Sequence, residues 1–196
     1  MFKNSGNEGF NMKVLFINAC VRKDSRTLRL AKHLLKKLDG DVTELNLEKE
    51  NIQALNCDTL AYRDTCLHYG KFNDPMLSYA KQFSEADIVV IAAPFWDFSF
   101  PSSLKNYIEA ITVSGVTFTY VNGIPKGLCK GKKLYFVSTC GGPFTPDFGY
   151  NYIKTMAQGF YGIPEAQCFT AEFLDVIGND VEAIMKAAED AIDREF

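Results

Sequence analysis

The chain has 196 residues, a formal net charge of −3, and a composition that is 47% hydrophobic and 23% charged. This length predicts one globular domain with a sizeable core. The charge balance offers no basic surface for a phosphodiester backbone, so nucleic acid is not an expected partner. No apolar run approaches the roughly 20 residues that a membrane span needs. We also expect no secretion signal at the start of the chain.

The six cysteines include no CxxC pair, and in a chain of this size they do not resemble a disulfide framework. We therefore expect a reducing, cytoplasmic location. Cys57 and Cys66 lie near His68 in a stretch, residues 48–74, that is expected to be largely irregular. Two cysteines and one histidine do not complete a tetrahedral site, so no metal is predicted.

Predicted strands and helices alternate along the chain. Residues 1–12 are polar and rich in Gly and Asn, which predicts a flexible leader before a single domain at 13–196. Apolar runs predict five strands, at 13–18, 42–47, 88–93, 134–139 and 166–171. Helical spacing of apolar residues predicts helices around 28–38, 59–67, 75–83, 103–111, 150–162 and 180–192. Gly40 is expected to close the first of these helices.

This alternation predicts an α/β fold, a doubly wound five-stranded parallel sheet in a three-layer α/β/α arrangement with strand order 2-1-3-4-5. In that order the first, third and fourth strands are neighbours, and ligands bind beyond the carboxyl ends of the strands. The unusual loops of this chain, 19–27, 94–98 and 139–142, follow those three strands. One ligand can therefore contact all three loops.

The first of these loops has the composition of an anion site. Ser25, Arg26 and Thr27 lie where the next helix begins, so its free N–H groups and the positive end of its dipole face the loop. There is no GxGxxG and no GxxxxGK[ST] motif, so neither a dinucleotide fingerprint nor a P-loop is indicated. A hydroxyl-lined loop suits one terminal phosphate; a plain capping loop with nothing bound is the alternative.

The other two loops suit a flat ligand. Pro94 ends the third strand because it has no N–H to donate, and four aromatic residues follow within 95–100. These indicate a planar ring as the ligand, although aromatic residues that cap a core would give the same pattern. Gly141 and Gly142 let the backbone approach a ligand, or else form a simple turn. Residues 114–123 alternate in polarity and end in Asn-Gly, which predicts a hairpin outside the main sheet.

Three segments resemble one known family, the flavodoxin-like NAD(P)H-dependent quinone reductases and FMN-dependent azoreductases. AAPFWDFSFPSSLKNYIE resembles the family pattern AP-[MF]-[YW]-N-F-x-x-P-x-x-LK-x-[YF]-[IF]-D. GVTFTYVNGIPKGLCKGKK resembles G-x-TF-x-Y-x-x-x-G-x-x-GL-x-x-GKK, and STCGG stands where the family has S/T-x-GG. The resemblance covers nearly the whole chain from Met12 onward.

The resemblance implies a flavodoxin-like fold, non-covalent FMN, and hydride transfer from NADH or NADPH to the flavin and then to a quinone, azo or nitroaromatic acceptor, with ping-pong kinetics. It also implies a homodimer whose acceptor slot is lined by both subunits. By position, the residues expected to bind the cofactor are Cys20, Ser25, Arg26, Thr27, Pro94, Phe95, Trp96, Asp97, Phe98, Thr139, Cys140, Gly141 and Gly142. Phe118, Tyr120 and Phe144 are expected to form the walls of the nicotinamide and acceptor slot.

No catalytic acid or base is assigned, because in such enzymes the cofactor carries the chemistry. Backbone N–H groups at 140–142 are expected to stabilise negative charge on the reduced flavin. The chain departs from the family in having Asp97 for the usual Asn, Cys20 for a common Ser and Trp96 for a frequent Tyr. Residues 56–74 resemble a loop of iron–sulfur flavoproteins without its cluster cysteines, so no cluster is predicted.

Two other functions stay open at this point. A flavodoxin-type electron carrier would bind FMN but have no small-molecule substrate of its own. Such carriers tend to be strongly acidic for docking to redox partners, so the net charge of −3 and the extra hairpin argue against this class. A flavin-free regulatory or scaffold protein on the same fold is the second alternative, because fold does not dictate function.

Overall fold

The computed structural model describes residues 11–145 and 148–196, so the predicted leader, 1–12, lies almost wholly outside the described residues. Its strands are β1 (Lys13–Asn18), β2 (Asp41–Asn46), β3 (Ile88–Ala92), β4 (Phe118–Val121), β5 (Ile124–Gly127), β6 (Lys133–Thr139) and β7 (Glu165–Ala171). Five of them form a parallel sheet in the order β2-β1-β3-β6-β7, while β4 and β5 form a separate antiparallel hairpin. With the hairpin set aside this is the order 2-1-3-4-5, so the predicted sheet and the predicted hairpin are confirmed.

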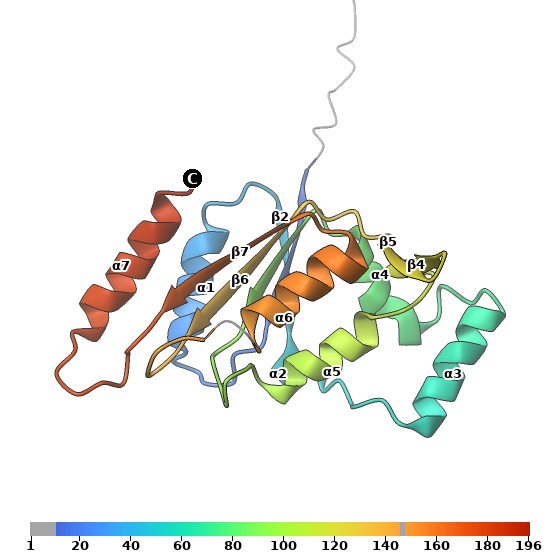
Figure 1. Ribbon diagram of the computed structural model, residues 1–196, viewed down its shortest axis with the longest axis horizontal. Helices are drawn as coiled ribbons and strands as arrows, with labels where there is room; N and C mark the ends of the chain where they lie inside the picture. Colours follow the sequence, from blue (N-terminus) through green and yellow to red (C-terminus); the bar gives the residue numbers. More distant parts are fainter. Residues whose placement is uncertain (1–10, 146–147) are drawn as a thin grey trace, which may run out of the picture.

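Helices cover both faces of the sheet (Figure 1). They are α1 (Arg26–Leu35), α2 (Leu47–Glu50), α3 (Cys57–His68), the 3₁₀ turn η1 (Pro75–Leu77), α4 (Ser78–Glu85), α5 (Ser102–Ile111), α6 (Tyr150–Thr155), the π-helical η2 (Met156–Tyr161) and α7 (Val181–Asp193). Helices α1 and α7 lie on one face, and α4, α5 and α6 lie on the other, while α3 stands at the end of the molecule remote from α7. None of the helices in the described part of the chain is long and apolar enough to cross a membrane.

The two cores follow from the alternation of side chains along each strand. On β1, Leu15 and Ile17 pack in the core beneath α4, α5 and α6, whereas Val14 and Phe16 pack in the core beneath α1 and α7. All four side chains are at most 2% exposed. A strand that is buried on both faces must be apolar at every position, which explains why the parallel strands read as continuous apolar runs.

Two element ends differ from the sequence-based expectation. Helix α1 stops at Leu35 with Lys36 as its C-cap, so the prediction that Gly40 closes this helix is wrong. Gly40 instead lies directly before β2. A Cβ atom there would lie 2.4 Å from the carbonyl oxygen of Met12, so only glycine lets these two chain segments approach so closely. The predicted helix at 150–162 begins at Tyr150 as expected, but its second half widens into the π-helical η2.

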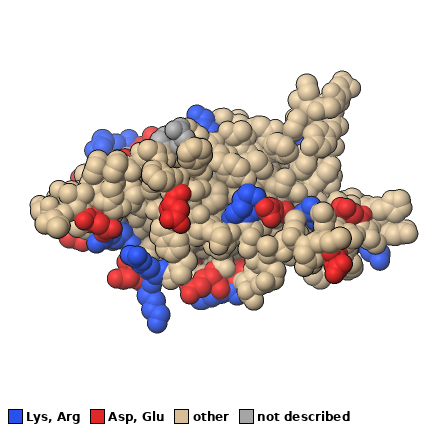
Figure 2. All heavy atoms as spheres, turned by 60° about the horizontal axis from the view of Figure 1, so that its bottom comes forward, with Lys and Arg blue, Asp and Glu red and all other residues tan. Residues whose placement is uncertain are grey.

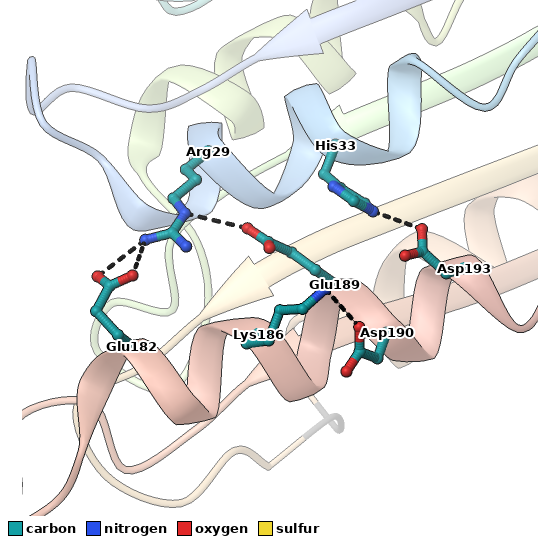
Figure 3. A network of polar contacts seen from close by, with 7 residues as sticks. All are labelled: Arg29, His33, Glu182, Lys186, Glu189, Asp190 and Asp193. Atoms are coloured by element: carbon teal, nitrogen blue, oxygen red, sulfur yellow. Dashed lines mark hydrogen bonds and ion pairs between the residues drawn. The ribbon is translucent and has the colours of Figure 1, made fainter.

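A chain of ion pairs joins the exposed sides of α1 and α7 (Figure 3). Arg29 lies 2.7 Å from a carboxylate oxygen of Glu182 and 3.1 Å from one of Glu189. His33 Nε2 lies 2.6 Å from Asp193, and contacts with Lys37 and His33 lower the pKa of Asp193 to about 2. Exposed pairs of this kind contribute little each, so the buried contacts between the two helices and the sheet hold this layer in place.

Candidate functional site

A cavity of about 310 Å³ opens at the carboxyl edge of the sheet. Its volume is at the lower end of the range for small-molecule sites. The lining residues come from the ends of β1, β3, β6 and β7: Val21, Arg22, Asp24, Ser25, Arg26, Thr27, Pro94, Phe95, Trp96, Thr139, Cys140, Gly141, Leu174 and Asp175. The structure therefore brings the three unusual loops together around one space.

Hydrogen bonding of the sheet continues past the strand ends into these loops. The N–H of Ala19 donates to the carbonyl oxygen of Ala92 at 2.9 Å, which joins the first loop to the end of β3. The N–H of Phe95 donates to the carbonyl oxygen of Thr139 at 3.0 Å, which joins the second loop to the end of β6. The walls of the cavity are thus extensions of the sheet.

One end of the cavity is formed by the first turn of α1. Ser25 is the N-cap of this helix, and its hydroxyl oxygen accepts the N–H of Leu28 at 3.2 Å. The buried hydroxyls of Thr27 and Thr139 lie 2.6 Å apart, so they link the first loop to β6. Because the first N–H groups of a helix have no partner within the helix, this end of the cavity offers backbone donors as well as hydroxyls.

The loop after β3 makes a tight turn beside the cavity. The N–H of Trp96 donates to the carbonyl oxygen of Ser99 at 3.2 Å, and the N–H of Ser99 donates back to Trp96 at 2.7 Å. The two central residues both have positive φ, +49° at Asp97 and +62° at Phe98. Positive φ is uncommon for Asp and a marked outlier for a bulky residue such as Phe, so the surroundings hold this turn in a strained shape.

Aromatic side chains support this turn. The ring of Phe95 packs edge-on against Phe144 at 5.1 Å and against Phe98 at 6.2 Å between centroids. Phe95 and Trp96 line the cavity. The Trp96 side chain is partly open to solvent, and Phe98 is largely so. An apolar, aromatic wall therefore lines part of the cavity.

The glycine loop after β6 forms the third wall. A Cβ atom at Gly141 would lie 2.4 Å from Oδ2 of Asp175, whereas a Cβ at Gly142 would meet nothing within 4 Å. A side chain at position 141 would collide with Asp175, so glycine is required there, whereas Gly142 borders open space. The N–H of Cys140 donates to Ala171 at 3.0 Å, so the expectation that this N–H would stabilise a reduced flavin is wrong. Because the N–H of Cys140 is engaged in this hydrogen bond of the sheet, the N–H groups of Gly141 and Gly142 are the backbone donors that this loop can offer to a ligand.

Most of the residues predicted to bind a cofactor line the cavity: Ser25, Arg26, Thr27, Pro94, Phe95, Trp96, Thr139, Cys140 and Gly141. Asp97, Phe98 and Gly142 flank these residues in the chain without lining the cavity. Cys20 lies beneath the loop, where its thiol donates to the carbonyl oxygen of Ala92 at 3.8 Å. Burial raises the pKa of Cys20 to about 11, and burial likewise raises the pKa of Cys140 to about 11, so both stay as thiols.

The three predicted slot residues do not come together within one chain. Phe144 packs against Phe95 at the cavity. Phe118 and Tyr120 lie on β4, where Phe118 is buried against Phe160 and Tyr120. The hairpin precedes β6 and packs on η2, so it stands at the amino end of the sheet, away from the cavity (Figure 1).

The sequence reasoning missed several lining residues, namely Val21, Arg22, Asp24, Leu174 and Asp175. The first three lie in the loop 19–27, which the strand-end rule had already marked. Leu174 and Asp175 follow β7, whose pairing with β6 places Ala171 opposite Thr139. The same rule, applied to the fifth strand, indicates this loop, because its exit lies next to that of the fourth.

The order of the strands and the position of the cavity define a class, the doubly wound proteins that bind ligands at the switch point of the sheet. Residues 12–196 match a family described as having a flavodoxin-like fold. The chain belongs to this family, which confirms the predicted fold and resemblance.

Several relatives match along nearly their full length. Proteins named FMN-dependent NADH:quinone oxidoreductase from Lachnoclostridium phytofermentans and Coprothermobacter proteolyticus are 38% and 36% identical to this chain. The matches cover 91% and 90% of this chain, and 94% and 96% of the relatives. The crystal structure of an FMN-dependent NADH-azoreductase from Bacillus anthracis, in complex with FMN, superposes with a TM-score of 0.77 at 26% identity. That superposition covers 94% of this chain and 99% of the azoreductase.

Proposed function

We propose that this protein is an FMN-dependent NAD(P)H oxidoreductase that reduces a quinone, azo or nitroaromatic acceptor. The observation that carries the proposal is the convergence of the loops after β1, β3 and β6 on one cavity. The names of the relatives support the reaction class, and the azoreductase that was crystallised with FMN supports the cofactor.

The donors and surfaces of the cavity fit FMN. The start of α1 offers backbone N–H groups with the hydroxyls of Ser25 and Thr27, a set that suits a phosphate. Phe95 and Trp96 offer an apolar wall for a flat ring system. At Gly142 the backbone borders open space that a Cβ atom would enter. The phosphate and the ring system of FMN therefore each have a matching part of the cavity.

In this proposal the chain binds, orients and shields, while FMN, when bound, supplies the capacity to accept and release hydride. No side chain is assigned as an acid or base. Gly141 and Gly142 present backbone donors beside the ring position, and Trp96 forms part of a wall that is open to solvent. Because one open face serves both the nicotinamide and the acceptor, they bind in turn and the kinetics are ping-pong.

We further propose a homodimer in which the hairpin of one subunit reaches the cavity of the other. Tyr120 is 56% exposed and Ile124 is 69% exposed at this hairpin, although both are large apolar residues. Tyr120 would then line the slot of the partner subunit, with the buried Phe118 packed behind it. This arrangement reconciles their predicted role with their distance from the cavity of their own chain. A monomer in sedimentation velocity at micromolar concentration would contradict this arrangement.

The visible spectrum of the purified protein tests the cofactor directly. A flavin absorption that NADH or NADPH bleaches under anaerobic conditions supports the proposal. Steady-state oxidation of NADH with menadione then separates an enzyme from an electron carrier, because a carrier turns over almost no menadione. A colourless protein that fails to retain added FMN would instead favour the regulatory or scaffold alternative.

The phosphate position is tested by Ser25→Ala combined with Thr27→Ala. Two lost hydrogen bonds to a charged group are expected to weaken FMN binding by roughly 100-fold or more, measured by quenching of flavin fluorescence. Riboflavin lacks the phosphate, so its affinity should change much less. The matched control is Thr65→Ala with Ser78→Ala, which removes two hydroxyls that bond only local carbonyls. Unchanged FMN affinity in the first variant would remove the phosphate assignment.

A further inference from the structure

Arg26, at the start of α1, already has an anionic partner within the cavity. Its Nη1 atom lies 2.8 Å from Oδ1 of Asp175 and 3.4 Å from the carbonyl oxygen of Leu174. Arg26 and Asp175 both line the cavity. The second oxygen of Asp175 stands over Gly141, 2.4 Å from where a Cβ atom would lie. This carboxylate therefore lies between the anion-binding end of the cavity and the glycine loop.

The backbone of the loop after β7 holds Asp175 in this place. The N–H of Asp175 donates to the carbonyl oxygen of Gly141 at 3.1 Å, and the N–H of Leu174 donates to that of Cys140 at 3.2 Å. The N–H of Phe173 adds a third bond of this kind, to Gly142 at 3.0 Å. A loop that is tied to its neighbour by three backbone hydrogen bonds keeps its side chain near the cavity when a ligand enters.

The charge balance of the cavity is unusual for a site that takes a phosphate. Its lining carries two cations, Arg22 and Arg26, and two carboxylates, Asp24 and Asp175. Acidic and basic side chains are likewise interspersed over this side of the molecule (Figure 2). A phosphate monoester carries a charge near −2 at neutral pH, so it meets a carboxylate as well as an arginine here. The negative charges of the phosphate and of a carboxylate in the same cavity repel each other, even at a solvent-exposed surface.

This inference rests on the proposed function. We propose that Asp175 is a specificity-determining residue, which competes with the phosphate of FMN for the guanidinium of Arg26. The competition lowers the affinity for FMN without affecting a flavin that has no phosphate. Asp175 thereby reduces the ratio of FMN affinity to riboflavin affinity, because specificity is a difference between two affinities and this carboxylate lowers only one of them.

The test compares FMN and riboflavin binding to the apoprotein of Asp175→Asn at low ionic strength. Asparagine keeps the shape and the backbone N–H, while the charge is removed and one acceptor oxygen becomes an amide N–H₂ donor. We expect FMN to bind roughly three- to tenfold more tightly, in line with the modest strength of exposed charge pairs, and riboflavin affinity to stay within about twofold. The gain for FMN should shrink as salt is added, because ions screen exposed charges.

Glu182→Gln provides the matched control. Glu182 makes a similar exposed contact with an arginine, at 2.7 Å from Arg29 (Figure 3), but it lies outside the cavity lining. Both variants lose one negative charge, so a gain in FMN affinity that Glu182→Gln shared would be a long-range effect and would overturn the proposal. FMN affinity that is unchanged or weaker in Asp175→Asn would overturn it too.

A double-mutant cycle with Arg26→Gln tests the competition itself. If Asp175 acts through Arg26, then Asp175→Asn should improve FMN binding less in the Arg26→Gln background than in the natural protein. An equal gain in both backgrounds would overturn competition for this guanidinium. Failure of the natural protein to bind either flavin would be a different result, since it would remove the proposed function on which this inference rests.

Discussion

The chain makes the same kind of two-residue turn twice, with very different residues. At the tip of the hairpin, Asn122 and Gly123 have φ of +53° and +78° between the paired strands β4 and β5. Beside the cavity, Asp97 and Phe98 have φ of +49° and +62° between Trp96 and Ser99, which form an isolated antiparallel bridge. Asn-Gly is the preferred sequence for such a turn, and Asp-Phe is not.

The difference shows what holds each turn. The hairpin turn is favoured by its own residues and projects into open space. The turn beside the cavity is held from outside, by the packing of Phe98 on Phe95 and by a hydrogen bond of 2.9 Å from the hydroxyl of Ser99 to the carbonyl oxygen of Phe148. Backbone strain of this kind persists only where the surroundings impose it, and it gathers at functional sites.

The first way to break this comparison is to remove the favourable residue from the hairpin. Gly123→Ala places a Cβ at φ of +78° with no neighbouring atom within 4 Å, so the cost arises from the backbone alone. We expect a loss of about 1 kcal/mol in the free energy of unfolding, measured by urea denaturation. The flavin affinity of the folded variant should stay close to that of the natural protein. An unchanged stability would mean that this turn does not need its glycine.

The second way is to relieve the strain beside the cavity. Phe98→Gly should raise the free energy of unfolding of the apoprotein by about 0.5–1 kcal/mol, because the left-handed backbone no longer carries a side chain. FMN binding should weaken at the same time, since Phe95 lines the cavity and loses its edge contact with Phe98. Thermal melting of the apoprotein and a fluorescence titration measure the two effects. A variant that is less stable than the natural protein would show that the packing of Phe98 on Phe95 contributes more than the relief of backbone strain.

The smallest expected effect comes from replacing one side-chain oxygen at the turn beside the cavity. Asp97→Asn changes a carboxylate to an amide at a position with positive φ, where both residues are tolerated better than most. Asn is the residue that the resemblance leads one to expect there. We predict a gain of a few tenths of a kcal/mol in stability, in line with the preference of such turns for Asn. Differential scanning calorimetry on matched apoprotein samples should resolve it, and a clear loss of stability would assign a structural role to the carboxylate.

The sheet could be predicted from the sequence because parallel strands buried on both faces must be apolar throughout. The ligand edge could be predicted because strand order decides which loops meet. Gly40 could not be placed in the same way, since nothing nearby in the sequence separates a helix-ending glycine from one that is required by contact with Met12. The π-helical η2 likewise has no local signature in the sequence, and in the structure it packs against β5.

Which cavity residues can be predicted depends on how far apart in the sequence the residues that position them lie. Ser25 and Thr27 can be predicted because a helix start carries its own capping residues. Asp175 cannot be predicted in this way because its place depends on the pairing of β6 with β7, which sets Ala171 opposite Thr139 and brings the next loop across Gly141. Tyr120 was assigned a role by resemblance alone, and its position on the hairpin could not be obtained from local sequence.

The sheet hydrogen bonds that run on into the loops at Ala19 and Phe95 have a consequence for ligand uptake. Because these bonds form together with the sheet, the starts of the two loops are held in place before any ligand enters. Little conformational entropy is left to be lost at the moment of encounter. The apparent affinity is then close to the intrinsic affinity, because most of the protein is already in a binding-competent state.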